Sequence, residues 1–355
     1  MVLGDVPRSR RAQGTQGRVM RVGLDARLTR QMSVGMKAYA RELAARLPRV
    51  APDLAFVTFD RGANFSWDEQ VRLPAALRAA RLDLTHFLSL YTPVFAPRPS
   101  VITIHDLIHL RFPEYFKSKV GPYYQTVVRR ACARAARVIT DDERTIEDLQ
   151  RFLGVDPAKV RVVALGVDDC YLRAPQPHRG ERPYLLYVGN HRAHKDLPTL
   201  FAAWSSLDAE RALDLYLTGD DDFGDALAAY RRTNGRIVAL GEVGEGELAS
   251  YYAGARALVH PALTEGFGLP MLEAMAAGTL VIACEDAIPG VLRPAALTFR
   301  ARDAAGLRAQ LESVLRDEGL RDALVNEGRT LAAGLTWDRC ARSTADVYRE
   351  ILEGV

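Results

Sequence analysis

The alternation of short apolar runs with longer amphipathic segments constrains the fold of this chain more than any other feature. Each apolar run has the length of a buried strand and leads into a polar loop, and most of these loops lead into a segment with helical periodicity. The pattern predicts strands at 21–28, 55–59, 84–90, 100–107, 136–142 and 159–167, and helices at 37–47, 119–137 and 143–154. Alternating strands and helices fold into parallel sheets with helices on both faces.

The same alternation restarts after residues 173–183, a segment that contains three prolines and is typical of a linker. It predicts strands at 184–190, 213–219, 236–243, 255–262 and 279–285, and helices at 197–207, 225–233, 247–255 and 271–278. A chain of 355 residues is also too long for one ordinary core. We therefore expect an α/β protein with two Rossmann-like domains whose parallel sheets face a central cleft.

The expected domain boundaries follow from this pattern. Residues 1–19 are polar, and we expect a disordered tail there. Residues 20–175 would form the N-terminal domain and residues 176–335 the C-terminal domain. Residues 336–355 would form a closing helix that packs back on the N-terminal domain.

The composition and the apolar runs of the chain indicate where in the cell the protein is expected. Hydrophobic residues make up 48% and charged residues 26%, as in ordinary globular proteins. No apolar run approaches the roughly 18 residues of a membrane span, and the first 19 residues show no apolar core of a secretory signal. The four cysteines have neither disulfide nor metal spacing. We expect a cytoplasmic protein, with the inner face of the membrane as an alternative.

The two halves of the chain differ in charge. Residues 1–180 hold 29 Lys and Arg against 18 Asp and Glu, whereas residues 181–355 hold 18 against 26. A basic half fits an anionic acceptor or a membrane surface, and the basic segment 116–138 is a candidate for peripheral membrane contact. The alternative is that this segment packs on its own sheet. The aromatic platforms and motifs of nucleic-acid binding are missing, so we expect no nucleic-acid partner.

Residues 260–278, HPALTEGFGLPMLEAMAAG, read as a loop followed by a helix of small residues. Pro270 suits the first helical turn, and Gly266 and Gly268 let the backbone approach a ligand. The positive end of the helix and its free N–H groups can hold a phosphate. Glu265 before this helix and Glu273 inside it would then bind hydroxyls on either side of a diphosphate. A nucleoside diphosphate sugar has this layout.

The stretch TEGFGLPMLEAMAAGTLVIA closely resembles the signature of retaining family 4 glycosyltransferases, which have the GT-B fold. Further segments resemble the family in the same order: SVGMKAYARELAARL, SVITIHDL, YVGNHRAHKDLPTLFAAW, GEVGEGELASYYAGARALVHPAL and GLTWDRCARSTADVYREI. The resemblance covers roughly residues 20–353 and is strongest to the mannosyltransferase-like branch. It implies that the N-terminal domain binds the acceptor and that the C-terminal domain binds the nucleotide sugar.

The resemblance also implies roles for individual residues. Lys195 and Arg192, in the loop after a strand, would stabilise the departing diphosphate. His105 would face the sugar with its ring or its backbone carbonyl, and Gly35 would let the backbone approach the phosphate or the acceptor. The remaining predicted donor-binding residues are Glu265, Gly266, Phe267, Gly268, Leu269 and Glu273.

Two regions depart from the family pattern. Asp141, Asp142 and Glu143 stand where relatives often have a serine, and Gly290 stands where many have glutamate. These departures leave the acceptor and the fine donor geometry open.

The predicted reaction moves a hexose from a nucleotide sugar, of the GDP-mannose or UDP-glucose type, to an acceptor hydroxyl with retention of configuration. The acceptor would be a sugar, a lipid-linked sugar or a small molecule. No cofactor or metal is expected, and Asp220, Asp221 and Asp222 are interpreted as a solvated turn. A nucleotide-sugar 2-epimerase and a non-catalytic sugar-nucleotide-binding subunit are the alternative functions.

Overall fold

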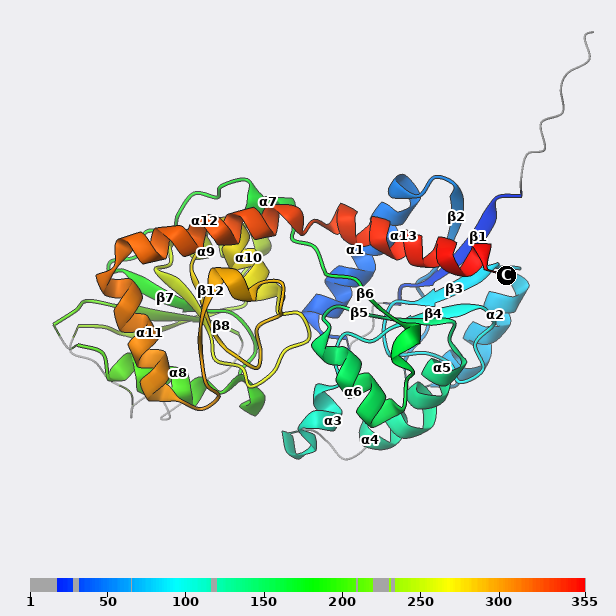
Figure 1. Cartoon of the computed structure of the whole chain (residues 1–355), viewed down its shortest axis with the longest axis horizontal. Helices are drawn as coiled ribbons and strands as arrows, with labels where there is room; N and C mark the ends of the chain where they lie inside the picture. Colours follow the sequence, from blue (N-terminus) through cyan, green and yellow to red (C-terminus); the bar gives the residue numbers. More distant parts are fainter. Residues whose placement is uncertain are drawn as a thin grey trace, which may run out of the picture.

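The computed structural model describes residues 18–27, 32–64, 66–115, 120–208, 210–219, 230 and 234–354. Most of the predicted tail, all but one residue of the helix predicted at 225–233, and the Asp220–Asp222 cluster lie outside these residues. Two lobes, each built around one parallel sheet, stand side by side (Figure 1). The prediction of two α/β domains with parallel sheets is confirmed.

Within the described residues, the first sheet has the order β2-β1-β3-β4-β5-β6, and every pair is parallel. Its strands are β1 (Met20–Asp25), β2 (Leu54–Phe59), β3 (Leu84–Phe87), β4 (Ser100–Thr103), β5 (Arg137–Thr140) and β6 (Val160–Val162). Its helical elements are α1 (Val34–Val50), η1 (Asp68–Arg72), α2 (Leu73–Ala79), α3 (Ile108–Arg111), η2 (Pro113–Tyr115), α4 (Val120–Tyr123), η3 (Tyr124–Val128), α5 (Arg129–Arg134), α6 (Arg144–Leu153) and η4 (Pro157–Lys159).

The second sheet has the order β12-β11-β10-β7-β8-β9 and is also parallel throughout its described strands. These strands are β7 (Tyr184–Tyr187), β8 (Asp214–Thr218), β9 (Ile237–Gly241), β10 (Ala257–His260), β11 (Val281–Cys284) and β12 (Ala296–Phe299). The helical elements are α7 (Asp169–Leu172), η5 (Ala193–Lys195), α8 (Leu197–Ser205), α9 (Glu245–Gly254), α10 (Leu269–Ala277), η7 (Arg293–Ala295), α11 (Ala304–Arg316), α12 (Glu318–Gly334) and α13 (Trp337–Glu353).

Several strands end earlier than the sequence predicts. The runs 84–90, 100–107 and 159–167 leave the sheet at Phe87, Thr103 and Val162. Leu88, Ile104 and Leu107 beyond those ends are nevertheless buried. An apolar run indicates burial, and it does not distinguish a strand from a buried loop at the edge of the sheet.

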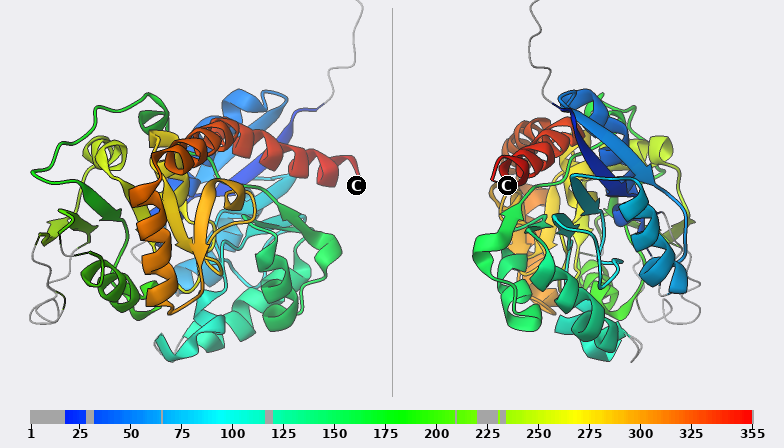
Figure 2. Two further views of the ribbon diagram at one scale, coloured as in Figure 1. Left: turned by 60° about the vertical axis from the view of Figure 1, so that its left-hand side comes forward. Right: turned by 90° about the vertical axis from the view of Figure 1, so that its right-hand side faces the viewer.

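The last helix, α13, lies against the first lobe although it follows the second lobe in sequence (Figures 1 and 2). Asp338 accepts a hydrogen bond from Arg46 of α1 at 2.7 Å. Inside the lobe, the hydroxyl of Tyr348 lies 2.6 Å from Nδ1 of the buried His86 of β3. These contacts fix α13 on both α1 and the first sheet.

The described part of the basic segment 116–138 forms α4, η3 and α5. Tyr124, Val128, Ala131 and Cys132 on its apolar face are buried in the core of the first lobe. The apolar face of this segment therefore packs on its own sheet, which was the alternative to membrane contact. No helix within the described residues is both long and apolar enough to cross a bilayer.

Candidate active site between the two sheets

The carboxyl edge of the second sheet brings two predicted site residues together. β7 pairs with β10 on one side and with β8 on the other, so the strand order reverses between β7 and β10. Ligands of open parallel sheets bind at such a reversal, beyond the carboxyl ends of the strands. Lys195 ends η5 after β7, and Glu265 lies in the loop after β10.

Glu265 is the centre of a charged cluster. The Lys195 ammonium donates a short hydrogen bond to Oε1 of Glu265, and Nε2 of His260 lies 2.8 Å from the same oxygen. Burial alone would raise the pKa of Glu265, but the Lys195 ammonium and the His260 ring hold this pKa well below its usual range. Glu265 is therefore an ionised hydrogen-bond acceptor over the whole neutral range.

The start of α10 has the geometry predicted for a phosphate site. Pro270 lies in its first turn, and the N-cap Gly268 has a φ of 76°, which favours glycine. No side chain caps this end among the described residues. The first turn of a helix leaves N–H groups without intrahelical partners, and these carry partial positive charge. An anion can bind here, next to Lys195.

Glu273 lies one turn further along α10 in a different environment. Its Oε2 accepts a hydrogen bond from the Tyr252 hydroxyl at 2.9 Å. Burial, together with the nearby carboxylates of Glu245 and Asp168, raises the pKa of Glu273 to about 7 against the effect of this hydrogen bond. The side chain lines a cavity of about 260 Å³ between the lobes, which is open to a ligand.

The first lobe supplies His105 from the loop after β4. Nδ1 of His105 lies 2.6 Å from Oδ2 of Asp141, which directly follows β5. The ring of Tyr39 from α1 meets the imidazole edge-on, with the ring centres 4.7 Å apart. Burial on its own would lower the pKa of His105, but the Asp141 carboxylate raises it overall.

The two lobes meet at the predicted glycines. A Cβ atom at Gly266 would lie only 3.0 Å from the backbone oxygen of His105, so the two backbones are in close contact across the cleft. A Cβ atom at Gly35 would lie 3.4 Å from Leu269 at the start of α10. Gly35 is in the first turn of α1 rather than in the loop expected from the sequence.

Arg192 and Phe267 have different surroundings. Arg192 is exposed at the start of η5 and faces the first lobe. Burial lowers the pKa of His109 in α3, and the Arg192 charge across the cleft adds to this effect. Phe267 is only 3% exposed and packs in the core, so its backbone rather than its ring is available to a donor.

Sequence reasoning assigned no role to His260 or Tyr252 and treated Asp141 only as a departure from the family. The partners of Tyr252 and Asp141 are distant in the chain. The partner of His260 is close in the chain, but it lies across a loop whose path the sequence does not give. One signal was present, because His260 is a polar residue at the end of an apolar strand, beside the glutamate motif. The structure adds these side chains to the site through direct contacts with Glu265, Glu273 and His105.

Comparison with known families covers both lobes. The sequence model described as "Glycosyltransferase Family 4" matches residues 32–170, and the one described as "Glycosyl transferases group 1" matches residues 182–317. A D-inositol 3-phosphate glycosyltransferase of Actinosynnema mirum is 30% identical over 293 residues, 71% of this chain and 68% of the relative. The chain belongs to glycosyltransferase family 4. It is an enzyme of the glycosyltransferase class.

Another relative of this family 4 enzyme is the O-antigen chain mannosyltransferase B of Escherichia coli. It is 27% identical over 291 residues, which cover 77% of this chain and 76% of the relative. The names of these two relatives mention different substrates, so the family alone does not fix the substrates of this chain.

Solved structures show the same architecture. Sucrose-phosphate synthase from Thermosynechococcus elongatus has a TM-score of 0.73 and 19% identity, and the match covers 95% of this chain and all of that one. Anabaena HepE in complex with UDP-glucose has a TM-score of 0.70 and 15% identity, over 93% of this chain and 99% of that one. The fold of the family 4 enzyme is therefore GT-B, as the sequence predicts.

Within the described residues, no group of three or more His, Cys, Asp or Glu side chains is placed to hold a metal ion.

Proposed function

We propose that the protein transfers a hexose from a nucleoside diphosphate sugar to an acceptor hydroxyl, with retention of the anomeric configuration. The observation that carries this proposal is the cluster of Lys195, Glu265 and His260 beside the open end of α10, facing the first lobe. A cation and a helix end suit the diphosphate, and an ionised carboxylate suits the sugar hydroxyls.

Each group then has one task in the reaction. The phosphates compete with Glu265 for the Lys195 ammonium, so that Lys195 and Arg192 stabilise the leaving diphosphate. Glu265, released from this ion pair and still bound by His260, accepts hydrogen bonds from the sugar. Glu273 accepts hydrogen bonds from the ribose. The acceptor hydroxyl attacks from the face that the diphosphate leaves, and the leaving phosphate takes its proton.

The cavity next to Glu273 favours a guanine nucleotide. Asp168 and Glu245 also line it, and both are carboxylates. The Watson–Crick edge of guanine carries adjacent N–H donors, including its N2 amino group, and carboxylates accept hydrogen bonds from such donors. We propose a GDP sugar of the mannose type as the donor, in line with the mannosyltransferase relatives.

Release of the nucleotide tests the proposal without knowledge of the acceptor, because slow transfer to water also cleaves the donor. The purified protein is incubated separately with GDP-mannose and with UDP-glucose. We expect release of GDP, and a loss of about 100-fold in Lys195→Ala, because this variant removes one group that stabilises the leaving charge. Lys159→Ala is the matched control, since Lys159 bonds only backbone carbonyls of the first lobe in the described structure.

Undiminished release in Lys195→Ala, or no release from either donor, would overturn the proposal. A changed sugar with the nucleotide still attached would identify an epimerase instead.

A further inference from the structure

His105 and Asp141 face each other because of strand register. β4 and β5 are adjacent and parallel, with Thr103 opposite Ile139. Two positions further along, the same register places His105 opposite Asp141. The resulting contact, 2.6 Å between Nδ1 and Oδ2, lies just beyond the carboxyl edge of the first sheet.

The imidazole of His105 is enclosed by residues of the first lobe. Asp141 is 2% exposed, and the His105 side chain is only 10% exposed. Tyr39 packs edge-on against the ring at an interplanar angle of 87°. The second ring nitrogen, Nε2, is also buried. A ring held in this way is poorly placed to contact a ligand in the cleft.

The backbone of His105 points the other way. Its carbonyl oxygen lies 3.0 Å from the Cβ position of Gly266 and therefore touches the loop that carries Glu265. A carbonyl oxygen is the negative end of a dipole. Beside a sugar held by Glu265, it can stabilise the positive charge that develops on the sugar ring during transfer.

We propose that Asp141 is a positioning residue: it anchors the imidazole of His105 beneath the cleft and so holds the His105 carbonyl against the donor sugar. This inference rests on the proposed glycosyl transfer and on the contact of the His105 carbonyl with the sugar, which the family resemblance already allows. It adds Asp141 as the residue that holds this carbonyl in place through the ring. A carboxylate suits the anchor, because charge-assisted hydrogen bonds are shorter and stronger than neutral ones.

The inference separates the two parts of His105. Asn places an amide N–H near the position of Nδ1–H, so His105→Asn keeps a donor for Asp141 while it removes the ring. Asp141→Asn likewise keeps an oxygen that accepts from the ring. In contrast, Asp141→Ala removes the hydrogen-bond partner of the buried ring. The ring can then shift, and the attached backbone of His105 can shift with it.

Donor cleavage by these variants provides the test. We expect Asp141→Ala to lower kcat by about tenfold or more and to leave the KM of GDP-mannose nearly unchanged, because a small displacement of a positioned group affects the chemical step. Asp141→Asn and His105→Asn should retain most of the wild-type kcat, whereas His105→Ala should lose it. Asp322→Ala, at an exposed position of α12, is the control.

Thermal unfolding shows whether each variant is folded. A folded Asp141→Ala variant with wild-type kcat would overturn the inference. So would a His105→Asn variant as inactive as His105→Ala, because the ring itself would then be needed.

A measurement on the wild-type protein keeps this inference separate from the proposed function. In ¹⁵N-histidine-labelled protein, a short bond to a carboxylate gives a strongly deshielded Nδ1–H proton signal. That signal should be present in the wild type and absent in Asp141→Ala, whether or not any donor is cleaved. Its absence from the wild type would overturn the anchoring contact, while a failure of donor cleavage alone would overturn the transferase proposal.

Discussion

The pKa values of two glutamates of one motif are shifted in opposite directions in this site. Glu265 is kept ionised by Lys195 and His260, whereas burial raises the pKa of Glu273 to about 7. The sequence predicted both residues and their places before and inside a helix. It did not predict their ionisation, because Lys195 lies 70 positions from Glu265 and Tyr252 lies 21 positions from Glu273.

The raised pKa of Glu273 makes stability depend on pH. The folded protein keeps the Glu273 proton that the unfolded chain releases above its ordinary pKa of 4.5. Stability contributed by this proton is therefore complete below pH 4.5 and lost as the pH rises to about 7. Glu273→Gln lacks this titration, and we expect it to exceed the wild type in free energy of unfolding at pH 8 by about 2 kcal/mol.

Urea unfolding at pH 4.5 and pH 8, without ligand, measures this difference. Glu318→Gln, at an exposed position, is the control. An equal effect of Glu273→Gln at both pH values would show that Glu273 is not the titrating group. The same variant should bind GDP more weakly, because it loses a charged acceptor for the ribose.

At the scale of elements, the sequence predicted the sheets better than their edges. The periodicity of apolar residues reports which residues are buried, so it predicted most strands and the helix α6. In the structure this helix ends at the C-cap Gly154. It did not reveal where β3 or β4 leaves the sheet, because the buried residues after those strands remain apolar. The site residues lie in these edges, and their contacts depend on register between strands.

The start of α10 allows a test at this scale. Gly268 has a φ of 76°, whereas Gly244 at the start of α9 has a φ of −70° and open space around its Cβ position. We expect Gly268→Ala to lower the free energy of unfolding by about 1 kcal/mol or more and to weaken GDP binding, because alanine disfavours this conformation.

Gly244→Ala should leave both quantities nearly unchanged. Chemical denaturation and calorimetric titration with GDP measure the two effects. Equal stability and equal GDP affinity of the two variants would contradict the role assigned to the start of α10.

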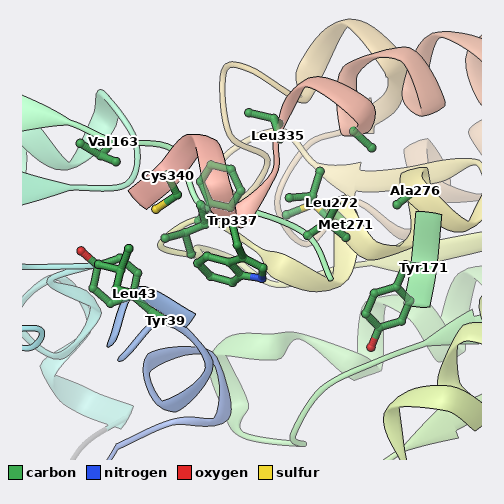
Figure 3. Close-up of a cluster of buried hydrophobic side chains, with 14 of the residues drawn as sticks. Tyr39, Leu43, Val163, Tyr171, Met271, Leu272, Ala276, Leu335, Trp337 and Cys340 are labelled. Carbon is green, nitrogen blue, oxygen red and sulfur yellow. The ribbon is translucent and has the colours of Figure 1, made fainter. Parts of the chain in front are cut away.

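At the scale of the whole molecule, the two lobes are joined where the chain crosses between them twice. Val167 donates its N–H to the Leu335 carbonyl at 3.0 Å and pairs with Thr336. Beside this crossing, Trp337 packs among side chains of both lobes, including Leu43 of α1 and Met271 of α10 (Figure 3). Local sequence patterns contain no information on such long-range contacts.

Other contacts hold the lobes together at the far side of the cleft. Arg144 donates to the Asp286 carbonyl at 2.7 Å, and Asp142 accepts from the Gly290 N–H at 3.1 Å. The sequence singled out Asp142 and Gly290 as departures from the family pattern. The structure joins these two departures in one contact between the lobes.

Gly166 packs against the backbone where the chain crosses between the lobes, and its substitution tests this crossing. A Cβ atom there would lie 2.1 Å from the backbone nitrogen of Trp337, and a backbone atom cannot move aside as a flexible side chain can. We expect Gly166→Ala to lower the free energy of unfolding by about 1–3 kcal/mol and to change the radius of gyration measured by X-ray scattering. Gly290→Ala has open space at its Cβ position and should do neither. A Gly166→Ala variant with wild-type stability and dimensions would contradict this description of the crossing.

We propose that one site holds the donor: the start of α10 with Lys195 binds the diphosphate, and Glu265 and Glu273 bind the rings on either side. A crystal structure of the protein with GDP-mannose tests it most directly. We expect the diphosphate at the start of α10, the mannose against Glu265 and the His105 carbonyl, and the ribose against Glu273. A donor bound elsewhere, with Lys195 and Glu265 still paired to each other, would contradict it.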